Sequence, residues 1–228
     1  MENEYIKNLC KVFENMTPEE AAANDAEIER REKIQKAAEK IENYKTSGVP
    51  ARYINESLDT FSINNDWQAK AAGAAIKFIK DVKIGNFKTL ILLGSAGTGK
   101  THLAAAICRE LGGRFKTAPD LVEELRRLKS FTSNQTEIDL ITYYGKLSLL
   151  IIDEIGRGYA ATDEKYTLFQ ILNARYNTRK STVLISNFKK SEFLNYIGVA
   201  AADRLVESAD IYEINGESYR KELRAQNG

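Results

Sequence analysis

The sequence predicts an α/β fold in which helices cover both faces of a parallel sheet. Three apolar runs of strand length, residues 89–93, 148–152 and 182–185, are separated by segments with helical spacing. Weaker strands are expected at 114–117 and 211–214. Strands that alternate with helices form parallel sheets, and such sheets bind ligands beyond the carboxyl ends of their strands. We therefore expect the functional residues to follow these strands.

The size and composition of the chain fit one catalytic domain with a modest helical appendage. Of its 228 residues, 43% are hydrophobic and 29% are charged. No stretch approaches the roughly 18 apolar residues of a membrane-spanning helix. The polar start of the chain lacks the order of a signal peptide. We expect a cytoplasmic protein without membrane contact.

Net charge neither supports nor excludes nucleic-acid binding, whereas the cysteines argue against a zinc site. The 33 basic and 32 acidic residues leave a net charge of +1, so any nucleic-acid binding must depend on a local patch. Cys10 and Cys108 lie far apart and lack the spacing of zinc ligands. We expect both to be buried thiols in a reducing compartment.

A helical extension is predicted over residues 1–47. Residues 5–16 carry an apolar stripe at helical spacing, which either packs on the next helix or docks to a partner. Residues 17–20, Thr-Pro-Glu-Glu, have the pattern of a helix start with a capping box. The highly charged segment 21–44 then predicts a largely solvated helix or a helical hairpin.

The boundary between the two predicted domains lies at a helix-breaking segment. Residues 46–50 contain a glycine and a proline, which end the helix. Residues 48–228 therefore form the second domain, in which residues 67–82 predict a helix before the first strand.

The first strand leads directly into a phosphate-binding motif, Gly-x-x-x-x-Gly-Lys-Thr, at residues 94–101. A helix-prone run at 103–107 follows it, which completes the strand–loop–helix context that the motif requires. Glycines let backbone N–H groups surround the phosphates, Lys100 reaches the terminal phosphates, and Thr101 supplies a hydroxyl to Mg²⁺. The predicted nucleotide contacts are Gly94, Ser95, Ala96, Gly97, Thr98, Gly99, Lys100, Thr101 and His102.

Two carboxylates follow the second apolar run. Asp153 and Glu154 come at the carboxyl end of a strand of buried type, where a parallel sheet places them beside the phosphate loop. Asp153 is expected to hold Mg²⁺, and Glu154 to orient and polarise the attacking water. Such a pair can also serve only to cap a helix, but its combination with the phosphate loop favours catalysis.

Two further features concern the nucleotide and the only histidine. The chain has no Asn-Lys-x-Asp element of the kind that selects guanine, so ATP is preferred over GTP. His102 directly follows the phosphate loop. We expect it at a helical position packed against the sheet, without an acid or base role.

Five short motifs that lie apart in the sequence are specific for a protein family only in combination. They occupy residues 94–106, 150–156, 186–187, 202–205 and 218–220. Together they resemble the DnaC/IstB branch of the AAA+ ATPases, and most of all its DnaC-type bacterial or phage helicase loaders. The resemblance implies a five-stranded AAA+ sheet, ATP hydrolysis, and loading of a DnaB-type replicative helicase onto single-stranded DNA.

The same resemblance implies roles for three further residues. Asn187 matches the sensor-1 residue that responds to the γ-phosphate, although an asparagine here can also simply begin a turn. Arg204 matches the arginine finger that enters the ATP site of a neighbouring subunit, which implies a homo-oligomer. Arg220 matches the sensor-2 arginine of its own subunit. A lone arginine is otherwise a surface ion-pair residue. The end of the sequence at Gly228 implies that the usual C-terminal helical lid is missing.

The resemblance also implies surfaces for DNA and for the helicase. Arg126, Arg127, Lys129 and Phe131 match a loader-specific insertion whose basic and aromatic residues bind single-stranded DNA. The alternative for these residues is a solvated helix end. The zinc-binding cysteines of DnaI-type loaders are missing, so the helicase contact is expected through the plain helices of residues 1–47.

Two other functions stay open at this point. One is an IstB-like ATPase that helps a transposase on duplex DNA. The other is an adaptor or inhibitor that binds a helicase and uses nucleotide only as a structural ligand.

Overall fold

The computed structural model describes residues 17–128, 136–158 and 161–216. The chain divides into two compact units, Met1–Glu42 and Asn43–Gly228. The division falls between Glu42 and Asn43, whereas the helix-breaking segment of the sequence suggests a boundary between residues 47 and 48. The apolar stripe expected within residues 5–16 lies outside the described residues.

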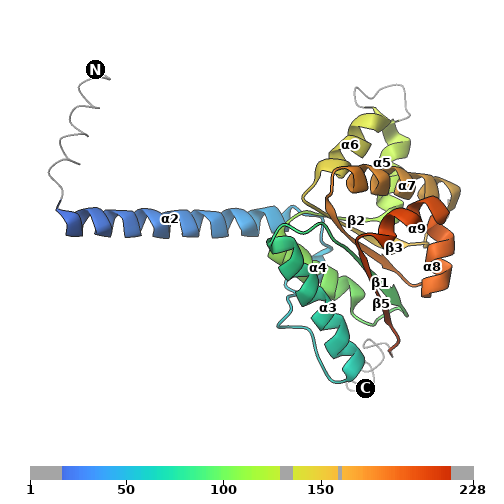
Figure 1. Cartoon of the computed structure of the whole chain (residues 1–228), viewed down its shortest axis with the longest axis horizontal. Coiled ribbons are helices and arrows are strands. Elements are labelled where there is room, and N and C mark those ends of the chain that lie inside the picture. The colour runs from blue at the N-terminus through green and yellow to red at the C-terminus, as the bar shows by residue number, and fades with distance from the viewer. Residues whose placement is uncertain (1–16, 129–135, 159–160, 217–228) are drawn as a thin grey trace. The chain divides into compact units, whose positions relative to one another are not determined.

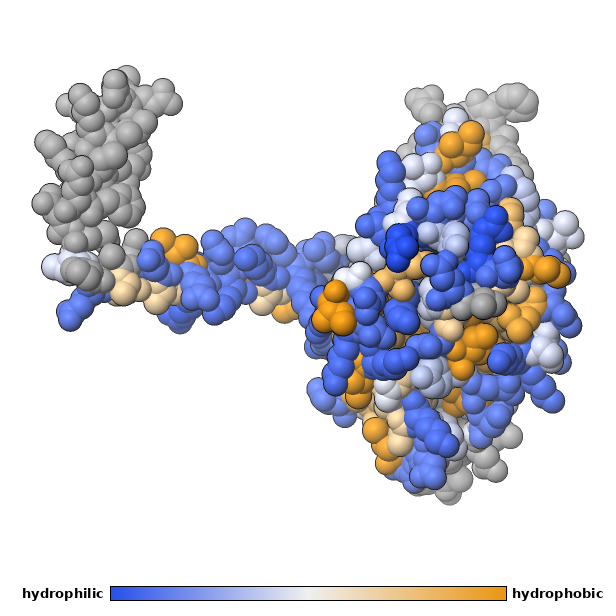
Figure 2. Space-filling model, in the orientation of Figure 1, coloured by the Kyte–Doolittle hydropathy of each residue, from blue (hydrophilic) through white to orange (hydrophobic). Residues whose placement is uncertain are grey.

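The described part of the extension is one continuous helix, α2, Pro18–Lys45. Residues 21–44 therefore form a single helix and not a helical hairpin. It begins at the proline that the sequence pattern places first. Ile28, Ile34 and Ile41 are 48%, 60% and 57% exposed, and Figure 2 shows a surface that is mainly hydrophilic along this helix. Pairs such as Glu27 with Arg31 and Glu29 with Lys33, each at 2.8 Å, add local support. These observations confirm a largely solvated helix.

The second unit contains a five-stranded parallel sheet, as predicted (Figure 1). Its strands are β1 Thr89–Gly94, β2 Arg114–Thr117, β3 Leu149–Ile155, β4 Ser181–Ser186 and β5 Ala209–Ile214. Their order in the sheet is β2-β3-β4-β1-β5, and every neighbouring pair is parallel. Strand β3 extends beyond the predicted residue 152 to Ile155, so it includes both candidate carboxylates.

Helices cover both faces of this sheet (Figure 1). They are η1 Ala51–Tyr53, α3 Asp66–Lys83, α4 Lys100–Leu111, α5 Ala118–Leu128, α6 Glu137–Lys146, α7 Ala161–Asn177, α8 Lys190–Ile197 and α9 Val199–Val206. None of the described helices has the length and apolar character needed to cross a membrane.

Strand β1 shows how the sheet separates two apolar cores. Leu90 and Leu92 pack with α3 and α4, whereas Ile91 and Leu93 pack with α5, α7, α8 and α9. Successive side chains of a strand point to opposite faces. A strand such as β1, which is buried at every position, therefore lies between two helical layers. This burial fixes the ends of β1, β3 and β4, and with them the loops that carry the candidate site.

Candidate nucleotide site

The phosphate loop needs glycine at defined positions. Gly94, Gly97 and Gly99 have φ angles of 121°, 87° and 85°, which L side chains rarely adopt. A Cβ on Gly94 would lie 2.2 Å from the carbonyl oxygen of Ile214, and one on Gly99 would lie 2.6 Å from the ring of Phe61. The loop therefore passes directly between strand β5 and this phenylalanine before α4 begins at Lys100.

The ammonium group of Lys100 lies against the loop itself. Its side chain is buried, and Nζ donates to the carbonyl oxygens of Gly94 and Ser95, each at 2.7 Å. Lys100 is also the first residue of α4, where the helix dipole is positive. A phosphate at this place would meet a lysine and the amino end of a helix, a combination that favours bound anions.

Thr101 and Asp153 connect the two predicted motifs. Thr101 Oγ1 donates to Asp153 Oδ2 at 2.8 Å, and the backbone N–H of Glu154 donates to Asp153 Oδ1 at 2.6 Å. Burial raises the pKa of Asp153, and its hydrogen bonds and the charge of Lys100 oppose that rise. A hydroxyl and a carboxylate side by side are oxygen ligands of the type that Mg²⁺ prefers, so the residues fit this ion.

Glu154 occupies an unusual backbone conformation. Its φ angle is 58°, in the left-handed region that non-glycine residues seldom adopt. Its Oε1 accepts a hydrogen bond from Arg157 Nη1 at 3.1 Å, and both side chains are about half exposed. Strain of this kind tends to occur at functional sites. Arg157 is a site residue that our sequence reasoning missed, since nothing in the motifs marks an arginine three residues after the carboxylate pair.

A pocket of about 610 Å³ collects most of the predicted site. Its size is in the range of small-molecule sites. It is lined by predicted residues Ala96, Gly97, Thr98, Gly99, Lys100, Thr101, His102, Asp153, Glu154 and Asn187, and also by Arg157. Its opposite wall, which includes Arg52, Tyr53 and Phe61, comes from the segment before α3. This wall was not predicted from the sequence, because its segment contains no motif.

His102 is on a helix, as expected, but its side chain does not pack against the sheet. Its Nε2 lies 2.9 Å from the carbonyl oxygen of Ser57 and 3.2 Å from Thr60 Oγ1. Its Nδ1 lies 3.4 Å from a carboxylate oxygen of Glu56, and its ring meets Phe61 edge-on at 5.3 Å. The predicted packing partner of His102, the sheet, was therefore wrong. Its side chain instead contacts the segment before α3, which forms the pocket wall, and so joins this segment to α4. The reason is that this face of α4 is covered by the preceding segment rather than by a strand.

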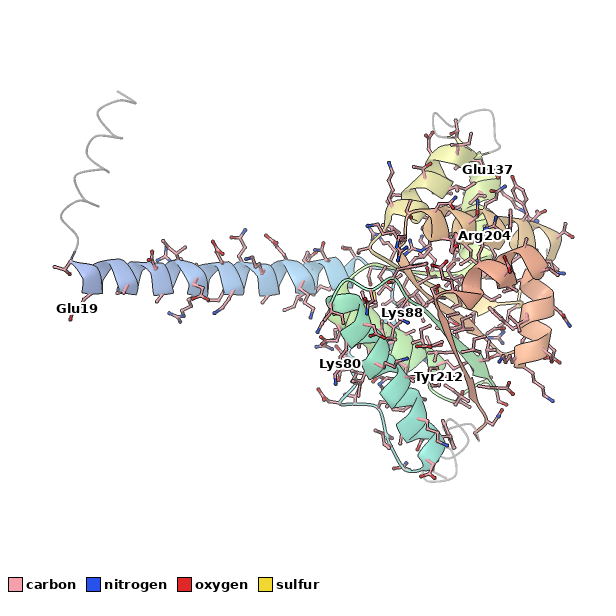
Figure 3. All side chains as sticks on the ribbon, in the orientation of Figure 1. Glu19, Lys80, Lys88, Glu137, Arg204 and Tyr212 are labelled. Atoms are coloured by element: carbon pink, nitrogen blue, oxygen red, sulfur yellow. The ribbon has the colours of Figure 1, made fainter. Side chains whose placement is uncertain are left out.

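The residues assigned by resemblance lie at different places. Asn187 follows β4 and lines the pocket, and its role as a sensor remains a prediction. Arg204 is on α9 (Figure 3), with Nη1 donating to the Ala200 carbonyl at 2.8 Å and the guanidinium 5.4 Å from the Phe169 ring. Among the described residues, Arg204 is not one of those that line this pocket. Arg220 lies outside the described residues, so both arginine assignments remain predictions.

The two described DNA candidates take part in ion pairs. Arg126 donates to Asp163 Oδ2 through Nε at 3.0 Å and Nη2 at 2.7 Å, and Arg127 pairs with Glu123 at 3.1 Å. These pairs are exposed and therefore weak. Lys129 and Phe131, the other two candidates, lie outside the described residues. The DNA contact also remains a prediction.

Comparison with known proteins gives results that agree with this geometry. The profile of the IstB-like ATP-binding proteins matches residues 24–227. The replicative helicase loader DnaC of Escherichia coli (strain K12) is 29% identical over 229 residues, which cover 96% of this chain and 91% of the loader. The insertion sequence IS5376 putative ATP-binding protein of Geobacillus stearothermophilus is 31% identical over 206 residues, covering 85% and 78%. The crystal structure of the DnaC helicase loader has a TM-score of 0.62 at 24% identity, over 72% of this chain and 99% of that one.

Proposed function

Since the chain belongs to the IstB-like ATP-binding proteins and has their AAA+ fold, we propose that it is an ATPase that loads a replicative DNA helicase onto single-stranded DNA. ATP hydrolysis controls when the helicase is held and when it is released. The observation that supports the hydrolytic part is the hydrogen bond between Thr101 and Asp153, with Glu154 next to Asp153 in the lining of the same pocket.

Each residue of the site has one task in this proposal. Lys100 and the amino end of α4 bind the terminal phosphates, and Thr101 and Asp153 hold Mg²⁺. Mg²⁺ held there would act as a Lewis acid and would neutralise the negative charge that develops on the transferring phosphoryl group. Glu154 orients and polarises the attacking water, and Asn187 holds that water from the end of the neighbouring strand. Arg204 acts in the site of an adjacent subunit.

Similarity to a helicase loader over nearly the whole chain supports this proposal. The similarity to the E. coli loader covers 96% of this chain, so it reaches into the helical extension. Helix α2 in that extension leaves Ile34 and Ile41 exposed. Exposed apolar residues on a charged helix are suited to a protein contact. In this proposal the extension binds a DnaB-type helicase, and the second unit assembles with other copies and contacts single-stranded DNA through the region of Arg126.

A binding experiment tests the partner. The full chain with ATP is mixed at micromolar concentration with the DnaB-type helicase of the same organism, and the complex is measured by pull-down. Complex formation is expected. Ile34→Glu should weaken it by about tenfold or more, whereas Ile84→Glu is a matched control, because Ile84 is 76% exposed outside the extension. No complex with the natural chain would rule out the loader.

A transposition helper is the second candidate, and it has its own supporting observation. The insertion-sequence protein is 31% identical over 85% of this chain. A helper would bind a transposase and duplex DNA, and it would leave the helicase unbound in the same pull-down. A third possibility, an adaptor or inhibitor that keeps nucleotide as a structural ligand, would bind the helicase without turning over ATP.

A further inference from the structure

A buried carboxylate lies behind the turn that carries Glu154. Glu164 is in the first turns of α7 and is only 1% exposed. Its Oε1 accepts a hydrogen bond from the backbone N–H of Gly156 at 2.6 Å. Gly156 is in the turn that ends β3, two residues after Glu154 and next to Arg157. Glu164 thus contacts the backbone of the catalytic turn from the side away from solvent.

The second carboxylate oxygen of Glu164 is enclosed as well. Oε2 and the hydroxyl of Tyr196 are both buried, and neither makes a hydrogen bond of ordinary geometry to the described residues. Burial, and next the neighbouring Glu164, raise the pKa of Tyr196. A Cβ on Gly158 would lie 2.5 Å from Oε2, so the backbone of the same turn passes directly against the carboxylate.

Helix capping does not explain why this carboxylate is buried. An acidic residue near the amino end of a helix is favoured by the helix dipole, but that benefit is available at the surface. Asp163, one residue earlier, is half exposed and pairs with Arg126. Burial of a carboxylate is unfavourable unless its hydrogen bonds compensate. The compensation here comes from the amide of Gly156.

The other side of the turn is held by the end of strand β4. Ser186 Oγ donates to the carbonyl oxygen of Ile155 at 2.7 Å. A Cβ on Gly156 would lie 2.2 Å from the ring of Phe188, and that ring is 5.2 Å from the ring of Tyr196. The turn is therefore clamped between Glu164 and the segment that contains Asn187. These contacts fix Glu154 and Asn187 relative to each other.

We propose that Glu164 is a positioning residue for ATP hydrolysis, which holds the backbone of Gly156 and so fixes the side chain of Glu154 in the orientation that catalysis needs. The inference rests on the proposed ATPase function. Loss of the Glu164 bond leaves the turn held only from the β4 side. Glu154 then samples orientations away from the attacking water, while Lys100 and Thr101 still bind nucleotide. A small displacement of a catalytic group lowers the rate far more than it lowers affinity.

Three variants test this role. Glu164→Leu removes the acceptor for the Gly156 amide and is expected to lower kcat about tenfold or more, with the Kd of ATP changed less than about twofold. Glu164→Gln keeps Oε1 as the acceptor, and its amide nitrogen can donate to the Tyr196 hydroxyl, so it should restore kcat to within about threefold of the natural chain. Ile171→Val, a buried change on the same helix, controls for a small loss of stability.

The turn itself supplies a second readout that needs no turnover. Trypsin should cut after Arg157 faster in Glu164→Leu than in the natural chain, Glu164→Gln or Ile171→Val, because the turn is looser. The Gly156 amide of the natural chain should exchange its hydrogen slowly. Rapid exchange there, or an unchanged kcat in folded Glu164→Leu, would overturn the inference. A natural chain that binds ATP without turnover would instead contradict the proposed function, and exchange and proteolysis would still test Glu164.

Discussion

Thr101 Oγ1 donates a hydrogen bond to Asp153 Oδ2 at 2.8 Å, although the two residues are 52 positions apart in the chain. The bond joins the start of α4 to strand β3. It exists because β1 and β3 are parallel strands of one sheet, whose carboxyl ends lie along the same edge. The fold therefore brings together the hydroxyl and the carboxylate that we propose as ligands of Mg²⁺.

We expect Asp153→Asn to raise the stability of the nucleotide-free protein while abolishing Mg²⁺-dependent turnover. Burial raises the pKa of Asp153, so the native state binds a proton at higher pH than the unfolded chain. For this group alone, stability is greatest below the unfolded pKa and is lost as the pH rises through the raised native value. Asparagine cannot ionise, so Asp153→Asn does not lose stability as the pH rises. The Tm should rise at about pH 7.5 and rise less at about pH 5, and a lower Tm at neutral pH would contradict the argument.

Glu154→Gln should reduce turnover by about a hundredfold or more and preserve ATP binding. Glutamine fills the same space but does not polarise a water as a carboxylate does. The measurement is a steady-state ATPase assay together with a titration of a fluorescent ATP analogue. Equal turnover in the natural chain and the variant would remove Glu154 from the chemistry. A natural chain that shows no turnover at all would support the hypothesis of an adaptor or inhibitor that binds nucleotide only as a structural ligand.

Arg157→Ala is expected to raise basal turnover modestly, by up to about fivefold. The guanidinium donates to Glu154 Oε1 at 3.1 Å and thereby competes with water for the carboxylate that we propose as the catalytic one. Both groups are about half exposed, and such pairs contribute only about 0.2–1 kcal/mol, which limits the effect. Lys83→Ala, which breaks the exposed pair with Glu110, is the control. A tenfold fall would mean instead that Arg157 contacts the phosphates.

The sheet and the motifs were predictable from the sequence because both have local signatures. Apolar runs identify buried strands wherever they occur, and the phosphate loop carries its own glycines and lysine. The roles of Arg157, Glu164 and Phe61 could not be predicted in this way. Each depends on a contact with one turn or loop, which only the folded chain brings about. The position of His102 on a helix was predicted, but its contacts with Ser57 and Thr60 were not.

Gly94→Ala should destabilise the protein by at least about 2 kcal/mol, because its φ of 121° is strained for alanine and its Cβ would meet the Ile214 carbonyl at 2.2 Å. Gly73→Ala is the matched control. Gly73 lies inside α3, where an added Cβ meets nothing within 4 Å, so alanine should stabilise by about 0.5–1 kcal/mol. Urea unfolding without nucleotide measures both. A small effect at Gly94 would mean that the loop can move away from β5.

The assignment of Arg204 can be tested by mixing two inactive variants. Arg204→Ala should lose the turnover that depends on assembly and keep its ATP affinity, because among the described residues Arg204 is not one of those lining the pocket of its own chain. Glu154→Gln should be inactive because its own site lacks the carboxylate that polarises water. If Arg204 acts in the neighbouring site, an equal mixture recovers activity, since some sites pair an intact Glu154 with an intact Arg204 from the next subunit. Random assembly predicts about a quarter of the natural rate. A mixture as inactive as its components would place Arg204 outside the neighbouring site, and unchanged turnover in Arg204→Ala alone would remove it from catalysis.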